Sequence, residues 1–468
     1  MTGTVRVFKE KTGSFKIRKI RHFLTTLPHL FASFIEFAAG LAYFRPSRTQ
    51  ATPAVATAPS SESPLMSKKE VSFKEFAVLM ALLMSIVAIS IDAMLPALGL
   101  VASDFALADR NHAQYVIGCI FIGMGAGQLV CGPLSDAIGR KPVLYASILL
   151  YFVGSLACYL APSFEWLIAG RLVQGLAVAG PYVSTVSIVR DKYAGRDMAR
   201  VMSIVMMIFI MVPAIAPTLG QAIMAFAHWR AIFLMYVLYA LVIGVWTFLR
   251  LEETLPPARR VPMTLASFGH GLREVLGNHV ALCYTICMGI TFGSFIGYLN
   301  SSQQIFVEKF HTGGLFTVYF GGLALVLGVA SMLNSRIVER LGMRHICLRS
   351  FIGIIVASAI FLAVNLSLGD VTLPMFVAYA AVLFFCFGLV FGNLNALAME
   401  PMGHIAGMAS AVIGASSSLI SMTLGSYIGQ LYNGTLVPIA TGFLTLSLLS
   451  LGIMLWAGSR RHAPGYGA

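Results

Sequence analysis

Twelve long apolar stretches restrict the fold of this chain more than any other feature. A helix that crosses a membrane needs about 20 mostly apolar residues, and each stretch has about that length. The expected spans are 75–97, 112–134, 142–161, 165–188, 199–226, 229–250, 279–302, 314–336, 345–366, 374–397, 405–430 and 436–457. Only 11% of the residues are charged, against roughly 25% in a soluble protein. The sequence therefore predicts an all-α membrane protein with twelve transmembrane helices and excludes a water-soluble globule.

One long connection divides the spans six and six. We expect five regions, which are an N-terminal extension (1–70), an N-terminal six-helix bundle (71–250), a central loop (251–278), a C-terminal six-helix bundle (279–458) and a short tail (459–468).

The two halves share short sequence matches at a nearly constant offset. The turn after the second span reads DAIGRK (136–141) and the turn after the eighth reads ERLGMR (339–344), so the acid, the glycine and the last base match at an offset of 203. Thr-Leu-Gly recurs at 218–220 and 423–425, at an offset of 205. Transporters are commonly built from such repeats, with the substrate site near the midplane of the membrane. The repeat predicts two pseudo-symmetric bundles.

The basic excess predicts the orientation. The chain has 32 Lys and Arg against 19 Asp and Glu, a net charge of +13. From Met66 onward, nineteen of 23 basic residues fall on one side of the expected spans, three on the other and one within a span. Loops rich in Lys and Arg face the cytoplasm. We therefore expect a multi-pass protein of the inner membrane with both termini in the cytoplasm, a lipid bilayer as its surroundings and no nucleic-acid partner.

The first 65 residues differ from the rest. Residues 1–22 carry seven bases and one acid, 23–44 are apolar, and 46–64 are rich in Pro, Ser, Ala and Thr. This segment could be an amphipathic helix on the membrane, a thirteenth span, a cleaved signal, or an upstream stretch that is not translated because Met66 is the start. We favour the last interpretation and expect little defined structure there.

A ten-residue segment after the second span, GPLSDAIGRK (132–141), carries the most specific motif. It resembles the G-x-L-(A/S)-D-x-x-G-R-(K/R) loop of the major facilitator superfamily. A glycine lets a neighbouring helix approach closely, and an acid can lie at a helix N-terminus or face a base. The expected gating residues are Gly132, Asp136, Gly139, Arg140 and Lys141. The alternative is a charged turn that only sets topology.

Asp92 and Arg171 are charged residues embedded in the first and fourth spans. A charge at the centre of a membrane costs roughly 2.5–3.5 kcal/mol on insertion scales, so each marks a candidate functional site. At 1.5 Å per residue both lie roughly 8–9 Å below the same surface, and we expect them to meet. Protonation of Asp92 would then loosen its hold on Arg171. The alternatives are a structural ion pair, or an Asp92 that touches water at the edge of its span.

The fifth span contains two prolines and a glycine, Pro213, Pro217 and Gly220. Prolines four apart remove two backbone hydrogen bonds on one face of a helix, which predicts a bent helix that seals or hinges the bundle; a static kink is the alternative. Met206 belongs to a methionine-rich face of the same span, which suits either apolar binding or plain packing.

Four segments together resemble one branch of the superfamily, the Bcr/CflA-type multidrug:proton antiporters. They are IDAMLPAL (91–98), RLVQG (171–175), PAIAPTLG (213–220) and EPMGHIAGMASA (400–411). The resemblance covers about residues 70–458 and implies the twelve-helix fold of that superfamily. In that family the acid of helix one and the arginine of helix four are implicated in proton coupling, a role that it implies for Asp92 and Arg171.

The substrate cavity is less specified. Polar and methionine side chains in the spans give six candidates, Met206, Tyr298, Asn300, Tyr319, Asn393 and Asn395; each polar one could instead form an interhelical hydrogen bond. The seven cysteines lack the spacing of a metal site, and phosphate-binding loops are absent from the sequence.

We therefore expect a monomeric, proton-coupled antiporter that exports small lipophilic drugs by alternating access. The proton gradient is its driving force, no cofactor or metal is expected, and it is not an enzyme. One alternative is an exporter of a metabolite such as a sugar, nucleoside or siderophore on the same scaffold. Another is a membrane sensor that binds its ligand without transport.

Overall fold

The structure, a computed structural model, describes residues 71–260, 265–369 and 371–460. These residues form helices and no strand. Twelve helical segments in this part of the chain are long and apolar enough to cross a membrane, which confirms the predicted fold class and number of spans. They are Phe73–Asp104, Arg110–Ile138, Arg140–Tyr159, Phe164–Lys192, Arg200–Met224, Ala231–Arg250, His279–Lys309, Gly313–Leu341, Met343–Leu368, Leu373–Gly403, Gly407–Gln430 and Val437–Ala457. The expected N-terminal extension lies outside the described residues.

The first span is interrupted directly after Asp92. Ser72 caps the N-terminus of helix α2 (Phe73–Asp92), because its hydroxyl accepts a hydrogen bond from the backbone N–H of Glu75 at 3.2 Å. Two short helices follow, η1 (Leu95–Ala97) and α3 (Leu98–Asp104). Pro96 lies in the first turn of η1, where a missing N–H is tolerated. The Ile89 and Ile91 carbonyls accept from the N–H groups of Ala93 and Met94, whereas the Ser90 carbonyl takes its partners from other helices.

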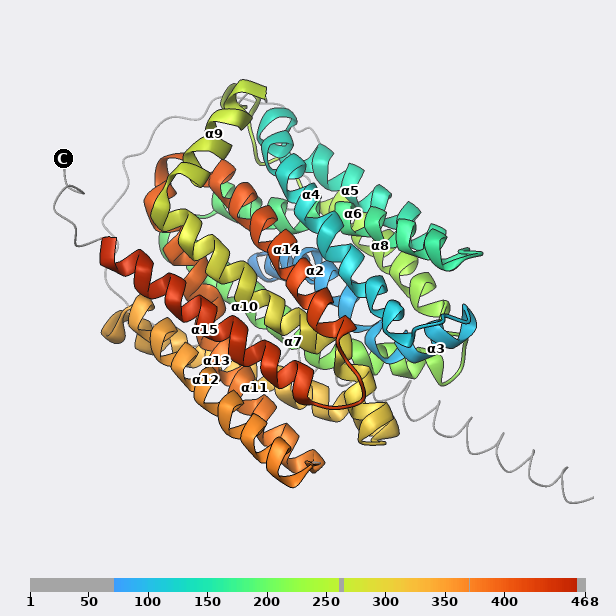
Figure 1. Ribbon diagram of the computed structural model, residues 1–468. Coiled ribbons are helices and arrows are strands. Elements are labelled where there is room, and N and C mark those ends of the chain that lie inside the picture. The colour runs from blue at the N-terminus through green and yellow to red at the C-terminus, as the bar shows by residue number, and fades with distance from the viewer. Residues whose placement is uncertain (1–70, 261–264, 370, 461–468) are drawn as a thin grey trace, which may run out of the picture. The chain divides into compact units, whose positions relative to one another are not determined.

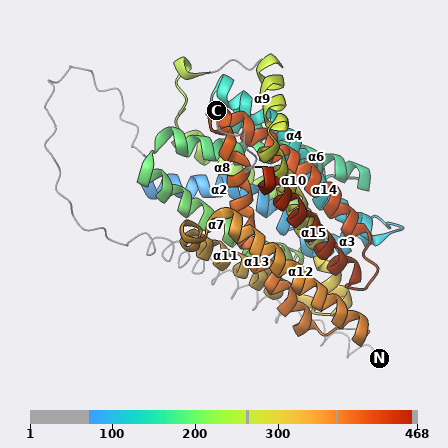
Figure 2. The same ribbon diagram turned by 60° about the vertical axis from the view of Figure 1, so that its left-hand side comes forward.

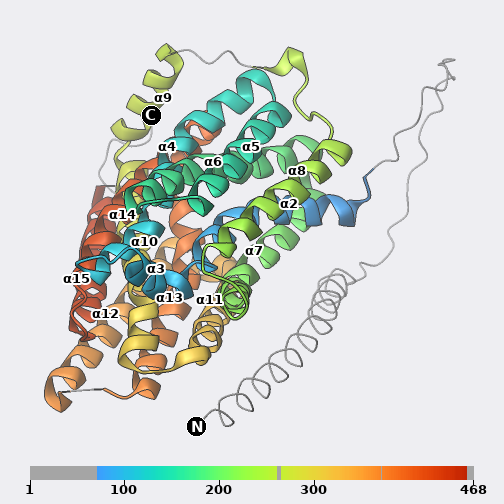
Figure 3. The same ribbon diagram turned by 90° about the vertical axis from the view of Figure 1, so that its right-hand side faces the viewer.

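The remaining helices form two groups of the same design. The N-terminal group comprises α2, η2 (Arg110–Gln114), α4 (Tyr115–Ile138), α5 (Arg140–Tyr159), α6 (Phe164–Lys192), α7 (Gly195–Met224) and α8 (Ala231–Arg250). The C-terminal group comprises α10 (His279–Gln303), the π-helix η4 (Gln304–Lys309), η5 (Gly313–Leu315), α11 (Phe316–Leu341), α12 (Met343–Leu368), α13 (Leu373–Met399), η6 (Glu400–Ile405), α14 (Ala406–Gln430) and α15 (Val437–Arg460). Figures 1 and 3 show α4, α5, α6 and α8 together on one side and α12, α13 and α15 on the other.

Contacts within the two groups repeat six spans apart. In the N-terminal group α4 packs on α6, α5 on α6 and α8, and α2 on α7; in the C-terminal group α11 packs on α13, α12 on α13 and α15, and α10 on α14. The turns repeat as well, because Gly139 (φ 111°) joins α4 to α5 and Gly342 (φ 75°) joins α11 to α12. Glycine adopts such positive φ values without the strain of a side chain. The structure is thus two pseudo-symmetric bundles, as the repeat predicts.

The two bundles meet along two seams, α4 with α14 and α7 with α11. On α4, Gly118, Gly125 and Gly132 are spaced by seven residues and all face α14, where a Cβ on each would lie within 4 Å of α14 side chains. On the second seam, Gly321 of α11 approaches the backbone of Ala214. Small residues let helices approach closely without locking large side chains together.

The molecule has two distinguishable ends. The basic end carries the α4–α5 turn and the last turns of α6 and α8; the opposite end carries η2 and η4. The predicted central loop lies at the basic end and is not a loop throughout, since it contains η3 (Pro257–Arg259) and α9 (Leu265–Gly277). Helix α9 packs on the start of α14, where Gly271 meets Met408, and Figure 2 shows it close to α10 and α14.

Candidate functional site

Asp92 is a buried acid at the last turn of α2. Its side chain is 4% exposed, and within the described residues no hydrogen bond or ion pair engages its carboxylate. The short helix η1, three residues further on, packs on α10, and the Tyr236 hydroxyl of α8 donates to the Ser90 carbonyl two residues before it. Asp92 therefore lies where the two bundles meet, because α10 belongs to the C-terminal bundle.

Arg171 is completely buried on α6, and each of its three guanidinium nitrogens donates a hydrogen bond. Nε donates to the Val116 carbonyl at 2.8 Å, Nη2 to the Ser90 carbonyl at 2.8 Å, and Nη1 to Oε1 of Gln174 at 3.0 Å. These acceptors belong to α4, α2 and α6. Arg171 thus joins three helices of the N-terminal bundle and caps the C-terminal end of α2, an end that favours positive charge.

The expected contact between Asp92 and Arg171 is wrong for this conformation. The cation of Arg171 is bonded to the Ser90 carbonyl, two residues before Asp92. Within the described residues no ion pair joins Arg171 to Asp92, and the guanidinium nitrogens are bonded instead to Val116, Ser90 and Gln174. Equal depth in the membrane did not reveal which groups Arg171 would bond.

Hydroxyl and amide groups complete the network around the end of α2. Oγ of Ser90 lies 2.6 Å from the Tyr151 hydroxyl, and the Tyr236 hydroxyl donates to the Ser90 carbonyl at 3.3 Å. Gln174 also donates to Ser155 at 2.7 Å. Of these partners only Gln174 lies in a recognisable motif. The tyrosines come from single positions on α5 and α8, which no local pattern distinguishes.

Gly220 positions α7 against the end of α2. A Cβ on this residue would overlap the carbonyl of Ala93, the residue after Asp92. Its repeat counterpart, Gly425, packs on α10 at Gly293 and Ile296. Pro213 and Pro217 lie within α7, which continues from Gly195 to Met224 without interruption. The expected close packing of this helix is present, beside the candidate proton-binding acid.

The α4–α5 turn at the basic end forms a second charged cluster. Arg140 bonds through Nε to Asp191 at 2.9 Å and through Nη1 to the carboxylate of Asp136. The backbone N–H groups of Arg140 and Lys141 each donate to Glu253 at 3.0 Å. Asp191 and Glu253 were not predicted, because they lie about 50 and 110 residues away in sequence. All five groups converge on one turn.

Asp136 also reaches the other bundle. A Cβ on Gly407, in the first turn of α14, would lie 3.3 Å from Oδ2 of Asp136. An acid at a helix N-terminus is stabilised by typically 0.3–1 kcal/mol. Gly132 lies one turn earlier on the same face of α4, 3.5 Å from Ala411 by the same measure. The turn therefore connects the N-terminal bundle to the start of α14.

Glu253 is the member of this cluster that lies outside the spans. Partial burial raises the pKa of its carboxyl, but hydrogen bonds from the backbone N–H groups of Leu255, Lys141, Arg140 and Thr254 outweigh burial, and its pKa is lowered. The charged form of Glu253 is thus the one that the turn stabilises.

The six candidate cavity residues do not gather at one place. Tyr298 and Tyr319 belong to an aromatic cluster, in which Tyr298 stacks on Phe320 at 6.1 Å and Tyr319 on Phe306 at 5.8 Å. Two others, Asn393 and Asn300, form interhelical hydrogen bonds, which was the alternative to a place in the cavity. Asn393 bonds Asn334 of α11 and Asn300 donates to the carbonyl of Gly425 of α14. Met206 and Asn395 are exposed.

Tyr298 has a feature that the sequence did not reveal. Its side chain is buried, and its hydroxyl has no hydrogen-bond partner among the described residues. A buried hydroxyl without a partner costs free energy. Tyr298 therefore supplies a free donor on α10, the helix on which η1 packs.

Comparison with known proteins agrees with this architecture. A family model described as Major Facilitator Superfamily matches residues 78–426. A bicyclomycin resistance protein homolog of Haemophilus influenzae is 26% identical over 352 residues, which cover 74% of this chain and 87% of that protein. The multidrug resistance protein MdtL of Klebsiella pneumoniae (strain 342) is 27% identical over 370 residues, covering 78% and 91%. Among solved structures, a D-xylose-proton symporter superposes with a TM-score of 0.64 at 15% identity, covering 81% of this chain and 95% of that one.

Proposed function

Because the chain belongs to the Major Facilitator Superfamily, we propose that it is a proton-coupled antiporter that exports small lipophilic drugs across the inner membrane. Membership makes the chain a membrane transporter rather than an enzyme. The drug class is supported by relatives that are named for bicyclomycin and multidrug resistance. The two bundles, about 71–250 and 279–458, would rock about the α4–α14 and α7–α11 seams and expose a midplane site alternately to each side.

The orientation is part of the proposal. Arg140, Lys141, Arg190 and Lys192 lie at the basic end, and loops rich in such residues face the cytoplasm. We place the basic end and both termini in the cytoplasm, and the end with η2 and η4 outside. The transporting unit is proposed to be a monomer, because one chain supplies both bundles.

The unpaired burial of Asp92 is the observation that carries the proton-coupling proposal. A buried carboxylate without a cation or hydrogen-bond donor costs several kcal/mol. We infer that Asp92 holds a proton while it is buried between bundles that touch at the outer end. When the site opens to the cytoplasm, the proton would leave and the carboxylate could hold a polar or cationic group of the drug. When it opens outward, a proton would displace the drug.

Arg171 would act as a positioning residue in this cycle. It holds the Ser90 carbonyl and so fixes the last turn of α2, which carries Asp92. Its charge is always present, because a guanidinium stays protonated in proteins. Gly220 serves the same purpose from α7 by permitting contact with Ala93. Tyr298, with its free hydroxyl, would donate to Asp92 once the acid is ionised.

The aromatic cluster of the C-terminal bundle is proposed to supply the apolar part of drug binding. Phe295 of α10 and Phe391 of α13 are half-buried with ring centroids 5.7 Å apart, and Phe292 lies 4.4 Å from Phe391. Aromatic rings favour stacking with planar apolar compounds. Met206, Asn300, Tyr319, Asn393 and Asn395 remain candidates for the rest of the site.

The charged turn is proposed to be the inner gate. Asp136 touches the start of α14 in the conformation described, and its bond to Arg140 ties that contact to Asp191. Opening the inner end along this seam would have to break the Asp136 contact. Substitutions of Asp136 should therefore shift the balance of conformations.

Everted membrane vesicles test the proposal. In wild type, ethidium, a planar lipophilic cation, should release protons from acidified vesicles, seen as recovery of a pH-sensitive fluorophore. Asp92→Asn should abolish this exchange while the protein still inserts into the membrane. Asp197→Asn, the same change at an exposed acid at the start of α7, is the matched control and should retain it.

Three outcomes would contradict the proposal. Full exchange by Asp92→Asn would remove Asp92 from proton coupling. Exchange driven by xylose or another sugar, with no response to ethidium, would favour the metabolite exporter. Binding of ethidium without any proton movement would favour the sensor.

A further inference from the structure

Four amide side chains join the two bundles at the end that carries η2 and η4. They are Asn111 and Gln114 of the N-terminal bundle and Gln304 and Gln430 of the C-terminal bundle, and we call them the outer latch. Nε2 of Gln304 donates to Oδ1 of Asn111 at 2.7 Å, and Nε2 of Gln114 donates to Oε1 of Gln304 at 2.8 Å. Gln304 therefore bonds two residues of the opposite bundle at once.

Backbone carbonyls at the end of α14 and directly after it extend the latch. Nδ2 of Asn111 donates to the carbonyls of Tyr432 at 2.9 Å and Gln430 at 3.2 Å. In the opposite direction, Nε2 of Gln430 donates to the Asn111 carbonyl at 2.8 Å. Nε2 of Gln114 also donates to the Gly429 carbonyl at 3.2 Å. Six hydrogen bonds thus cross between the bundles within one small region.

The π-helix η4 presents the C-terminal half of this latch. Gln304 is its first residue, and Glu308 follows four positions later. Oε1 of Glu308 lies 3.5 Å from Nη2 of Arg110, in η2 of the other bundle. π-helical turns are rare and occur frequently at functional sites. Here the wider turn directs both Gln304 and Glu308 toward the N-terminal bundle.

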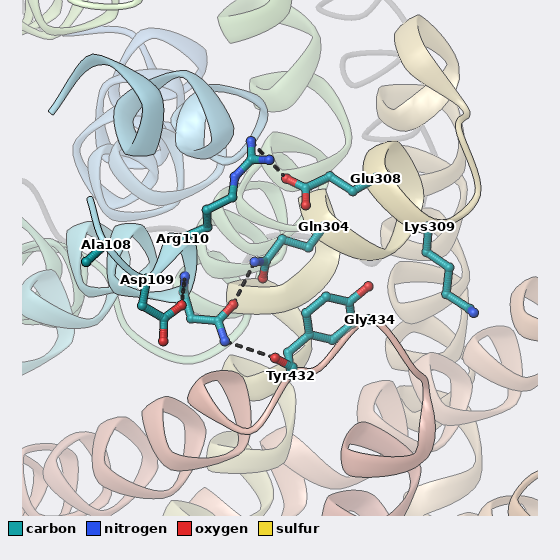
Figure 4. A pocket seen from close by; sticks show the side chains of 9 residues that line it. Ala108, Asp109, Arg110, Gln304, Glu308, Lys309, Tyr432 and Gly434 are labelled. Atoms are coloured by element: carbon teal, nitrogen blue, oxygen red, sulfur yellow. Dashed lines mark hydrogen bonds and ion pairs between the residues drawn. The ribbon is translucent and has the colours of Figure 1, made fainter. Parts of the chain in front are cut away.

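Water reaches the rim of the latch but not its centre. Asn111, Gln114 and Gln304 are 9%, 2% and 7% exposed. Beside them lies an open pocket of about 730 Å³, lined by Ala108, Asp109, Arg110, Asn111, Gln304, Glu308, Lys309, Tyr432 and Gly434. Figure 4 shows Arg110 directed at Glu308 across the pocket, with Gln304 between η2 and η4.

Amide bonds suit a contact that must form and break in every cycle. A neutral hydrogen bond exchanged for one with water changes the free energy little, whereas separating a buried ion pair leaves uncompensated charges. The one ion pair of the latch, Arg110 with Glu308, is at its exposed edge, where such pairs are weak. The pocket is open to solvent, so water can take over the amide bonds as the bundles part.

We infer that the outer latch is the gate that holds the exit closed, with Gln304 as its central residue. The inference rests on the proposed alternating access and on the orientation given above. In the conformation described the latch is engaged, and the N- and C-terminal bundles touch at their outer ends. Substrate release to the outside requires that Gln304 lose its bonds to Asn111 and Gln114.

Distances between spin labels test the latch without any need for transport. Labels at Leu160, at the outer end of α5, and Leu368, at the outer end of α12, are exposed and belong to different bundles. Double electron–electron resonance on these labels, in vesicles and with the native cysteines replaced, reports how often the outer ends are apart.

Gln304→Leu keeps the side-chain size but removes two bonds, so the open-to-closed ratio should rise on the order of tenfold. Asn111→Leu removes the same contact from the other bundle and should act in the same direction. Ser358→Ala is the matched control, because it removes a buried 2.9 Å hydrogen bond to Tyr379 within one bundle. This control should leave the distances unchanged.

Unchanged distances in both latch variants would overturn the inference, whatever their transport activity. A shift as large in Ser358→Ala would also overturn it, because the effect would then be general loosening. Failure of ethidium–proton exchange in wild type alongside shifted distances in Gln304→Leu would instead refute the proposed function and leave the latch standing.

Discussion

Arg171→Lys separates the positioning role of this residue from its charge. Three donors of the guanidinium reach acceptors on three helices, Val116, Ser90 and Gln174, at 2.8, 2.8 and 3.0 Å. A lysine ammonium is a compact point charge on a flexible stem, so it cannot span all three. We expect it to keep one bond and lose two.

The magnitude follows from those two bonds. Side-chain hydrogen bonds inside membrane proteins average about 0.6 kcal/mol and reach about 1.7 kcal/mol. Arg171→Lys should therefore lower the free energy of unfolding by about 1–3 kcal/mol. Ethidium–proton exchange should fall more steeply, because the last turn of α2 and Asp92 lose their fixed position.

Reversible unfolding in sodium dodecyl sulfate, followed by tryptophan fluorescence, measures the stability change. Arg340→Lys, the same substitution at an exposed position of α11, should match wild type in both stability and transport. Wild-type stability together with full exchange in Arg171→Lys would refute the argument that these bonds hold Asp92 in place. Unchanged stability with lost exchange would mean that Arg171 acts on substrate or proton directly.

Two further predictions concern packing and pH. Gly220→Ala places a methyl group against the Ala93 carbonyl, so it should destabilise the protein by about 1–3 kcal/mol and reduce transport. The control Gly452→Ala adds a methyl group in open space on α15 and should change neither stability nor transport. Equal behaviour of the two variants would contradict the close packing of Gly220. Hydrogen bonds lower the pKa of Glu253, so its support of the α4–α5 turn should be complete above about pH 4.3, the pKa of an unfolded glutamate. That support should disappear as the pH falls through the lower folded value. The protection of the Lys141 amide against hydrogen exchange, measured relative to an unstructured peptide at the same pH, should fall over this range in wild type. A Glu253→Gln variant with the same fall would contradict the assignment.

Span number, bundle division and repeat could all be read from the sequence, because each depends on local properties. A membrane helix requires an apolar run of fixed length, and the offset of about 203 between the two turns survives as the shared positive φ of Gly139 and Gly342. The rarity of charge in such runs also made Asp92 and Arg171 stand out, since an embedded charge is costly anywhere in a span.

The tertiary structure alone decided which of these groups meet. The packing of α6 on α2 gives Arg171 the Ser90 carbonyl instead of the Asp92 carboxylate, and segments distant in sequence place Asp191 and Glu253 at the α4–α5 turn. The outer latch joins Asn111 to Gln304, 193 residues later, and nothing in the composition of either segment predicts that bond. Apolar length and charge act residue by residue and so can be read along the chain. A hydrogen bond depends on the relative rotation and depth of two helices, which are set only when all twelve pack together.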